Sequence, residues 1–385
     1  MRYCFVAGNY PTETRQVHVF LENIVTKLVD KGEECTVIAP QSYVAYFLKK
    51  GIRRDIVSER ITPGGSKYTV YSPLYIVLPK IKIGELSTLD LQRWIIYKAL
   101  KRIYQKNDIN ADLIYSHFVR IGMSGVRLAK ELGIPSFIAN GEADTYAEIK
   151  MNSKSLLKQT LKDATGIISV STKNKNEIAK LSGNDSKVLE KTSVIVNAAD
   201  NDRFYQKDKI EIRKKMGWPL DAFVIAFTGS FIERKGVKKL SNVLDRFDDV
   251  YSIFMGVGDE KPTCKNILHC GRVKNAEMND FLNAADVFVL PTQAEGCSNA
   301  IVEAILCGLP VISSDREFNY DILDESCSIL IDPNSEEDIY KAIKELKEND
   351  AYREKLRNGA IERSKMLSLN YRVERIQSFI EERMS

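Results

Sequence analysis

The sequence predicts an α/β protein built from two doubly wound, Rossmann-like domains. Its 385 residues are enough for two hydrophobic cores of ordinary size. The chain opens with a short apolar strand, a loop, an amphipathic helix and a second strand, which is how a doubly wound sheet begins. Residues 285–315 have the same order of strand, loop, helix and strand, and so form a βαβ unit.

Composition excludes several classes of protein. Apolar residues make up 44% of the chain and charged residues 28%, which is typical of globular proteins. No run of 18 apolar residues predicts a transmembrane helix, and the first residues form a strand rather than a signal peptide. The seven scattered cysteines favour reduced thiols in the cytoplasm, and the three histidines do not cluster as metal ligands. We therefore expect neither a metal nor a cofactor.

Charge is unevenly distributed. Residues 1–200 carry 29 Lys and Arg against 20 Asp and Glu, a balance of +9, and the rest of the chain balances at −5. A basic N-terminal half predicts an anionic partner, such as a lipid phosphate or the inner face of the cell membrane. The alternative is a surface of dispersed, solvated lysines. The basic residues that lie beside aromatic and aliphatic ones are Lys49, Lys50, Arg53, Arg54, Lys80 and Lys82.

The first domain alternates strands and helices. Residues 3–8 form a strand that ends at Gly8, followed by a loop from Asn9. A helix at 19–32 and a strand at 35–40 come next. Residues 43–100 are interpreted either as a membrane-facing patch or as a core strand with a solvated loop.

Polar residues follow the later strands of this domain. Strand 112–118 ends near His117. A helix at 122–133 precedes strand 134–144, which ends in Asn140, Gly141 and Glu142. Residues 192–204 form a strand that leaves the domain.

The second domain begins with a strand at 223–230, which includes Gly229 and Ser230. The loop that follows holds Arg234 and Lys235, a position where a diphosphate could lie before the next helix. As an isolated tripeptide, Arg-Lys-Gly would indicate only a charged surface. Further along, the loop with Arg272 and Val273 follows another strand.

In the βαβ unit at 285–315, the junction between the loop and the helix could bind a phosphate. Its strand spans Asp286 to Leu290, and its helix spans Asn299 to Cys307, with Ser298 as N-cap and Gly308 as stop. The N–H groups of the first helical turn would bind a phosphate. The residues involved would be Gly296, Cys297, Ser298, Asn299 and Ala300.

Two glutamates flank that junction. Glu303 lies one helical turn after Asn299, where its carboxylate could accept from a ribose diol. Glu295, in the loop, could meet the hydroxyls of a sugar beyond the phosphate. An ordinary βα turn with solvated glutamates remains the alternative.

Glu295 and Glu303, with Gly-Leu-Pro-Val-Ile after them, resemble the signature of retaining GT-B glycosyltransferases, in particular glycosyltransferase family 4 (glycosyl transferases group 1) of the bacterial surface-polysaccharide type. The resemblance implies that Glu303 binds the donor ribose and that residues 295–299 bind the donor sugar and diphosphate. It implies a phosphate clamp at Arg234 and Lys235. Ser230 stands where the family has a second arginine, and the loop of Arg272 and Val273 would hold the nucleobase.

The resemblance is looser in the N-terminal half. Gly8 and Asn9 stand where the family has a pair of glycines, and Asn140 and Gly141 would complete the acceptor side. The family's histidine after strand 134–144 is absent, so Glu142, Asp144 or His117 would take its place. Asn197, Asp200 and Phe204 match the family's segment at the junction between the domains.

The resemblance implies a GT-B fold in which two Rossmann-like domains face a cleft. The acceptor domain would cover residues 1–202, with a helix at 366–385 packing back on it, and the nucleotide-sugar domain 203–365. The implied activity is transfer of a sugar, from a UDP-sugar, to a glycan or a polyprenyl-diphosphate-linked acceptor, with retention of configuration and without metal. Two alternatives stay open: a UDP-sugar epimerase of the same fold, and a relative that binds nucleotide-sugars without catalysis.

Overall fold

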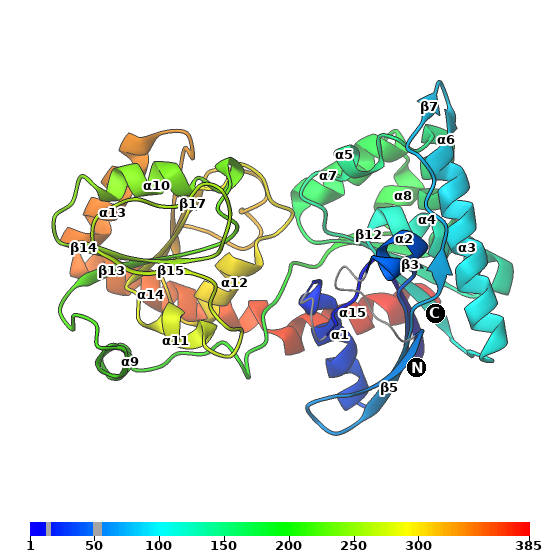
Figure 1. Cartoon of the computed structure of the whole chain (residues 1–385), viewed down its shortest axis with the longest axis horizontal. Coiled ribbons are helices and arrows are strands. Elements are labelled where there is room, and N and C mark those ends of the chain that lie inside the picture. Colours follow the sequence, from blue (N-terminus) through cyan, green and yellow to red (C-terminus); the bar gives the residue numbers. More distant parts are fainter. Residues whose placement is uncertain (13–16, 49–55) are drawn as a thin grey trace. The chain divides into compact units, whose positions relative to one another are not determined.

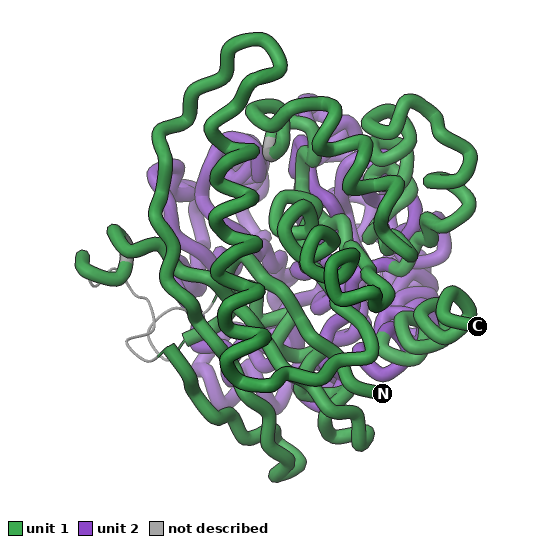
Figure 2. The backbone as a smooth tube through the Cα atoms, turned by 90° about the vertical axis from the view of Figure 1, so that its right-hand side faces the viewer, with its two compact units in different colours: residues 1–195, 373–385 green, residues 196–372 purple. Residues whose placement is uncertain are grey.

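The computed structural model describes residues 1–12, 17–48 and 56–385. The chain forms two compact units, residues 1–195 with 373–385, and residues 196–372 (Figure 2). The sequence placed the first boundary at 202–203. Residues 13–16 of the predicted acceptor-side loop, and Lys49, Lys50, Arg53 and Arg54 of the predicted basic patch, lie outside the described residues.

Unit 1 is built on a sheet of eight described strands, ordered β12-β11-β10-β9-β1-β2-β5-β4 (Figure 1). All neighbours are parallel except β4 and β5 at the edge. The strands are β1 (Arg2–Ala7), β2 (Glu34–Ile38), β4 (Val57–Ile61), β5 (Lys67–Tyr71), β9 (Leu113–His117), β10 (Ser136–Asn140), β11 (Gly166–Ser169) and β12 (Thr192–Val194). The central strands β9 and β10 are buried along their whole length, as expected of a parallel sheet covered on both faces.

Helices and two small strand pairs complete unit 1. The pairs are β3 (Gln41–Ser42) with β6 (Leu74–Tyr75), and β7 (Lys82–Ile83) with β8 (Leu86–Ser87). The helices are α1 (Val19–Asp30), α2 (Tyr43–Phe47), α3 (Thr88–Lys106), α4 (Val119–Leu132), α5 (Thr145–Ile149), α6 (Lys154–Asp163), α7 (Thr172–Ser182), α8 (Ser186–Glu190) and the end of α15 (Leu369–Met384). Helices α3 and α4 pack on the sheet through Ile96, Leu100, Ile121 and Leu128.

The C-terminal helix α15 contributes its last part to unit 1. Phe379 packs on Phe137 with ring centroids 6.1 Å apart, Gln377 donates to Glu33, and the Arg383 guanidinium donates to the Glu190 carbonyl. Residues 373–385 therefore belong to the core of a unit that begins at the other end of the chain.

Unit 2 contains a parallel sheet of six described strands, ordered β15-β14-β13-β16-β17-β18, with helices such as α10 and α11 on opposite faces (Figure 1). The strands are β13 (Phe223–Thr228), β14 (Val250–Met255), β15 (Ile267–Gly271), β16 (Val287–Leu290), β17 (Val311–Ser314) and β18 (Ser328–Ile331). The helices are α9 (Lys209–Met216), the 3-10 turn η1 (Glu233–Lys235), α10 (Val237–Leu244), α11 (Met278–Asn283), α12 (Asn299–Leu306), α13 (Glu336–Glu348), α14 (Asp350–Ser364) and the 3-10 turn η2 (Lys365–Leu367).

The predicted βαβ unit at 285–315 is confirmed as β16, α12 and β17. Helix α12 ends before Gly308, whose φ of 74° is the left-handed conformation that glycine adopts after a helix. Two predictions were wrong in extent. Residues 192–204 form a strand only at Thr192–Val194, and the predicted loop before α10 contains the turn η1.

Candidate functional site

The candidate site is built at the carboxyl ends of the unit 2 strands, where doubly wound sheets bind their ligands. Backbones approach closely there. A Cβ on Gly256 would lie 1.8 Å from the Gly229 carbonyl oxygen, and the Gly229 N–H donates to the Met255 carbonyl at 3.0 Å. The strand ends therefore bring the loops after β13 and β14 into contact.

A second close approach joins η1 to the loop after β16. Gly236 has φ 72°, and a Cβ there would lie 2.5 Å from the Pro291 carbonyl oxygen. The Gln293 N–H donates to the Arg234 carbonyl at 2.8 Å. This contact places the predicted phosphate clamp beside the loop that carries Glu295.

Four residues of these two loops form one ion cluster: Arg234, Lys235, Thr292 and Glu295. The Lys235 ammonium contacts Glu295 Oε1 directly, and Arg234 Nη1 lies 3.4 Å from the same oxygen. The Thr292 hydroxyl donates to that oxygen at 3.0 Å. The side chains of Lys235 and Glu295 are only 13% and 12% exposed, so solvent screens their interaction poorly.

The sequence predicted these charges but not their pairing. Glu295 was assigned to sugar hydroxyls and the two cations to phosphate, whereas the structure gives both cations the same carboxylate oxygen. Thr292 was missed as part of the site. Its position directly after the strand end, three residues before Glu295, was the only signal in the sequence.

The N-terminus of α12 offers unpaired donors. No described residue accepts a hydrogen bond from the N–H groups of Asn299, Ala300 or Ile301. Ser298 occupies the N-cap position, as predicted, but its side chain accepts no capping hydrogen bond. The side-chain oxygen Oδ1 of Asn299, an acceptor, is buried without a partner among the described residues. Free N–H groups at a helix N-terminus can bind an anion, and the phosphate position stays a prediction.

The loop before α12 is held in place by hydrogen bonds from Asn197, which lies in the segment that the sequence placed at the domain junction. The Asn197 side-chain amide donates to the Cys297 carbonyl at 2.9 Å, and Arg372 Nη1 donates to Asn197 Oδ1. Burial raises the pKa of the Cys297 thiol to about 12, so this thiol is neutral and no nucleophile. Cys297 contributes to the site through its backbone.

Glu303 is partly buried on α12, and no described residue donates a hydrogen bond to its carboxyl group. Burial raises the pKa of Glu303 to about 7, while the positive charge of Arg203 has a smaller opposite effect. A half-buried carboxyl group with no donor among the described residues is suited to accept from a ligand hydroxyl.

The remaining donor-side residues lie in two loops. Ser230 is exposed just after Gly229, and Arg272 is exposed beside the partly buried Val273. The Gly256 N–H donates to the Gly271 carbonyl at 2.9 Å, so the end of β15, directly before Arg272, lies next to the loop after β14.

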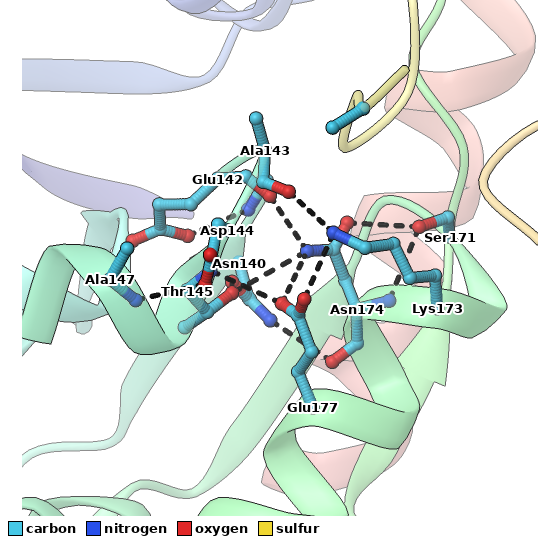
Figure 3. A network of polar contacts seen from close by, with 12 residues as sticks. Asn140, Glu142, Ala143, Asp144, Thr145, Ala147, Ser171, Lys173, Asn174 and Glu177 are labelled. Atoms are coloured by element: carbon cyan, nitrogen blue, oxygen red, sulfur yellow. Dashed lines mark hydrogen bonds and ion pairs between the residues drawn. The ribbon is translucent and has the colours of Figure 1, made fainter. Parts of the chain in front are cut away.

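In unit 1, Asn140 and Glu142 belong to a network of polar contacts (Figure 3). Asn140 is fully buried, accepts from the Thr145 hydroxyl at 3.0 Å and donates to the Asn174 carbonyl. Glu142 accepts from the Val119 N–H at 2.9 Å and the Gly141 N–H at 3.1 Å. Glu142 thus caps the start of α4, where its negative charge is favourable.

His117 is 2% exposed and packs between the rings of Phe20 and Phe118, with centroids 5.0 Å and 4.6 Å away. Gly8 and Asn9 are partly buried after β1. Roles for these residues toward an acceptor stay predictions.

Within the described ranges, no three His, Cys, Asp or Glu side chains are grouped to hold a metal ion. None of the described helices combines the length and apolar character needed to cross a bilayer.

Comparison with known proteins shows which proteins this chain resembles. Residues 208–363, which include the ion cluster and α12, match the family model described as Glycosyl transferases group 1. TuaC of Bacillus subtilis, a glycosyltransferase named for teichuronic acid biosynthesis, is 29% identical over 89% of this chain and 88% of its own length. A Campylobacter jejuni protein named N,N'-diacetylbacillosaminyl-diphospho-undecaprenol alpha-1,3-N-acetylgalactosaminyltransferase is 23% identical over 78% of both chains.

Solved structures share the fold. Sucrose-phosphate synthase from Thermosynechococcus elongatus superposes with a TM-score of 0.79 and 15% identity over 99% of both chains. Anabaena Alr3699/HepE in complex with UDP superposes with a TM-score of 0.73 and 14% identity over 99% of this chain and 100% of that one. The predicted GT-B fold is confirmed. The chain is a glycosyltransferase of this fold, and residues 208–363 match the group 1 family model.

Proposed function

We propose that the protein is a retaining glycosyltransferase that moves a sugar from a UDP-sugar to a lipid-linked glycan in surface polysaccharide biosynthesis. The observation that carries the proposal is the ion cluster beside the unpaired N–H groups of α12. Two cations and a helix N-terminus form a receptor for a diphosphate, and Glu303 lies one turn along the same helix. UDP in the HepE complex supports this choice of nucleotide, and the diphospho-undecaprenol in the Campylobacter relative's name supports the lipid carrier.

The chemistry follows from where charge develops. As the bond from the anomeric carbon to the diphosphate oxygen breaks, negative charge accumulates on that oxygen. Lys235, Arg234 and the α12 N–H groups stabilise this charge. The acceptor oxygen forms its bond to the anomeric carbon on the face that the diphosphate leaves, and its proton passes to the departing phosphate oxygen. The configuration is retained, and no step requires a metal.

Glu295 has two states in this scheme. Without donor, its carboxylate pairs with both Lys235 and Arg234. When the diphosphate takes over both cations, Glu295 is released to accept from hydroxyls of the donor sugar. A ligand must therefore carry more negative charge than one carboxylate to displace Glu295 from Arg234 and Lys235.

The direct test is a screen of the purified full chain with UDP- and GDP-sugars and a short polyprenyl-diphosphate glycan, followed by mass spectrometry. We expect an acceptor extended by one hexose or N-acetylhexosamine, with the anomeric configuration of the donor by NMR. Conversion of the UDP-sugar without acceptor would instead identify the epimerase. UDP binding without any product would identify a binding protein.

A lipid-linked acceptor requires contact with a membrane, and the β7–β8 hairpin is suited to it. Ile83 and Leu86 at its tip are 74% and 81% exposed. The hairpin stands out from the rest of unit 1 in both views (Figures 1 and 2). On α3, exposed Trp94 lies next to Lys98, whose ammonium is 5.4 Å from the Trp94 ring centroid. Aliphatic, aromatic and cationic groups in this order match the depth profile of a bilayer interface.

The backbone around the tip is fixed, so these apolar side chains are held in the open. Lys82 Nζ donates to the carbonyls of Lys150 and Asn152 at 2.8 Å and 2.7 Å, and the Lys154 N–H donates to Glu85 at 3.0 Å. Lys82 was predicted to face lipid phosphate. Its ammonium is instead used inside unit 1 to hold the hairpin.

Liposome sedimentation tests this contact. The full chain should pellet with anionic vesicles, and the exposed-site double substitution Ile83→Ser with Leu86→Ser should reduce the bound fraction about tenfold. Ile61→Ser, at a 67% exposed position of β4, is the matched control and should bind normally. Equal binding by all three proteins would reject the hairpin as the contact.

A further inference from the structure

Arg93, on α3, is a buried cation without a counter-charge. It is 8% exposed, its Nε is fully enclosed without a hydrogen-bond partner, and no described side chain forms an ion pair with it. Burying an unpaired charge is costly, so such a residue persists where something compensates for the cost. Arg93 plays no part in the donor site, which lies in unit 2.

The charged residue with the largest effect on Arg93 is another cation, Arg120. Burial lowers the pKa of Arg93 to about 10, the positive charge of Arg120 lowers it as well, and Tyr75 and Asp90 each have a smaller opposite effect. Asp90 is committed elsewhere, because its carboxylate accepts from the Asn152 amide at 2.9 Å and the Ser153 N–H at 3.1 Å. Arg93 remains protonated at neutral pH. Arg120 precedes Ser124 by one turn of α4, and Ser124 bonds the backbone of Arg93, so both arginines lie where α3 meets α4.

The position of these two arginines is defined by the fold. Arg120 lies in the first turn of α4, just after the carboxyl end of β9, the edge of a doubly wound sheet at which ligands bind. The Ser124 hydroxyl donates to the Arg93 carbonyl at 2.9 Å and ties α3 to α4. The neighbouring Gln92 bonds the backbone of Ile76 and Leu78, so the helix that carries Arg93 cannot shift easily.

We propose that Arg93 and Arg120 form a binding site for a phosphate or diphosphate group. A guanidinium offers paired N–H donors that match phosphate oxygens, and two of them supply the charge of a dianion. The bound anion accepts from the remaining N–H groups of Arg93 and offsets its buried charge. The assignment of this anion to the carrier diphosphate of the acceptor rests on the proposed function, whereas anion binding itself does not.

The test is calorimetric titration of the full chain with inorganic pyrophosphate, in saturating UDP so that the clamp at Lys235 is occupied. We expect saturable binding that weakens at least tenfold in Arg93→Met and in Arg120→Met. Arg102→Met, on the same helix but exposed, is the matched control and should bind as the unchanged protein does. Farnesyl diphosphate, compared with farnesol, distinguishes a lipid-borne diphosphate from a free one: tighter binding than pyrophosphate indicates the lipid source.

Two outcomes would overturn the proposal. One is pyrophosphate affinity that is the same in all four proteins, or absent from all of them. The other is an Arg93→Met protein that melts well below the unchanged protein while it still binds pyrophosphate, since the guanidinium would then serve the fold. The titration does not measure sugar transfer. A negative titration therefore does not contradict the proposed activity, and a negative transfer assay does not contradict this anion site.

Discussion

Lys235 and Glu295 form an ion pair that joins the loops after β13 and β16, sixty residues apart in the chain, and both side chains are almost buried. Arg234 and Thr292 contact the same carboxylate oxygen. The cluster is neutralised only in part, because two cations share one anion.

The first prediction concerns Glu295→Gln. Removing the carboxylate leaves both cations available, so UDP should bind roughly fivefold more tightly, a gain of about 1 kcal/mol. Turnover should fall, because the sugar loses an acceptor for its hydroxyls. Calorimetry with UDP measures the first effect, and Glu325→Gln, at an exposed position of the same unit, is the control. Weaker UDP binding would show that the carboxylate supports the nucleotide and does not compete with it.

Lys235→Ala should act mainly on the rate. If Lys235 stabilises charge that develops as the diphosphate leaves, kcat should fall more than the KM of the donor rises. Steady-state kinetics over a range of donor concentrations separates the two. A change confined to KM would place the contribution of this residue in ground-state binding.

Glu303 should make nucleotide binding depend on pH. Its folded pKa of about 7 lies above the ordinary 4.5. The folded protein therefore keeps this proton at pH values where the unfolded chain has lost it, and the contribution to stability falls as pH rises through that window. The ionised carboxylate is the better acceptor for ribose hydroxyls, so UDP affinity should rise through about pH 7.

Glu303→Gln isolates this effect, because the phosphates of UDP titrate equally in both proteins. The ratio of the two affinities should change with pH by up to about tenfold. A constant ratio between pH 5.5 and 8.5 would remove Glu303 from the ribose site.

Gly236→Ala tests the junction of η1 with β16. Gly217 is the matched control, because its φ of 69° is nearly that of Gly236 but no atom lies within 4 Å of a Cβ built there. Gly217→Ala should cost about 1–2 kcal/mol of unfolding free energy. Gly236→Ala must also move the Pro291 carbonyl, so its loss should be larger and accompanied by loss of activity. Urea denaturation measures both, and equal losses would contradict the close approach.

Transfer should continue in excess EDTA, because Arg234, Lys235 and the α12 N–H groups supply the positive charge that a metal would otherwise supply. Activity measured with and without Mg²⁺ after chelation is the check. Activity that disappears in EDTA and returns with Mg²⁺ would contradict the expectation.

The sequence predicted the βαβ unit around Glu303 well because its signals are local: a buried strand, a helical face and Gly308 at the helix end. It also placed Arg234 and Lys235 on the correct loop. It could not predict that Glu295 pairs with them, since that contact depends on the approach of Gly236 to Pro291. Arg93 was missed for the same reason: a basic residue on a helix is expected to face solvent, and only the packing of α3 on α4 buries it.

The hydrogen bonds from Asn197 to Cys297, and from Arg372 to Asn197, have a practical consequence for anyone who wishes to study nucleotide binding on a smaller piece of the protein. A fragment trimmed to residues 208–363, the stretch that the family model matches, would lack both side chains. It would also lose the pairing of Ala199 with Leu367 and Leu369. The loop in front of α12 would be left without its donor, and weak UDP binding by such a fragment would reflect where it was cut. Residues 196–372 keep all of these contacts within one piece.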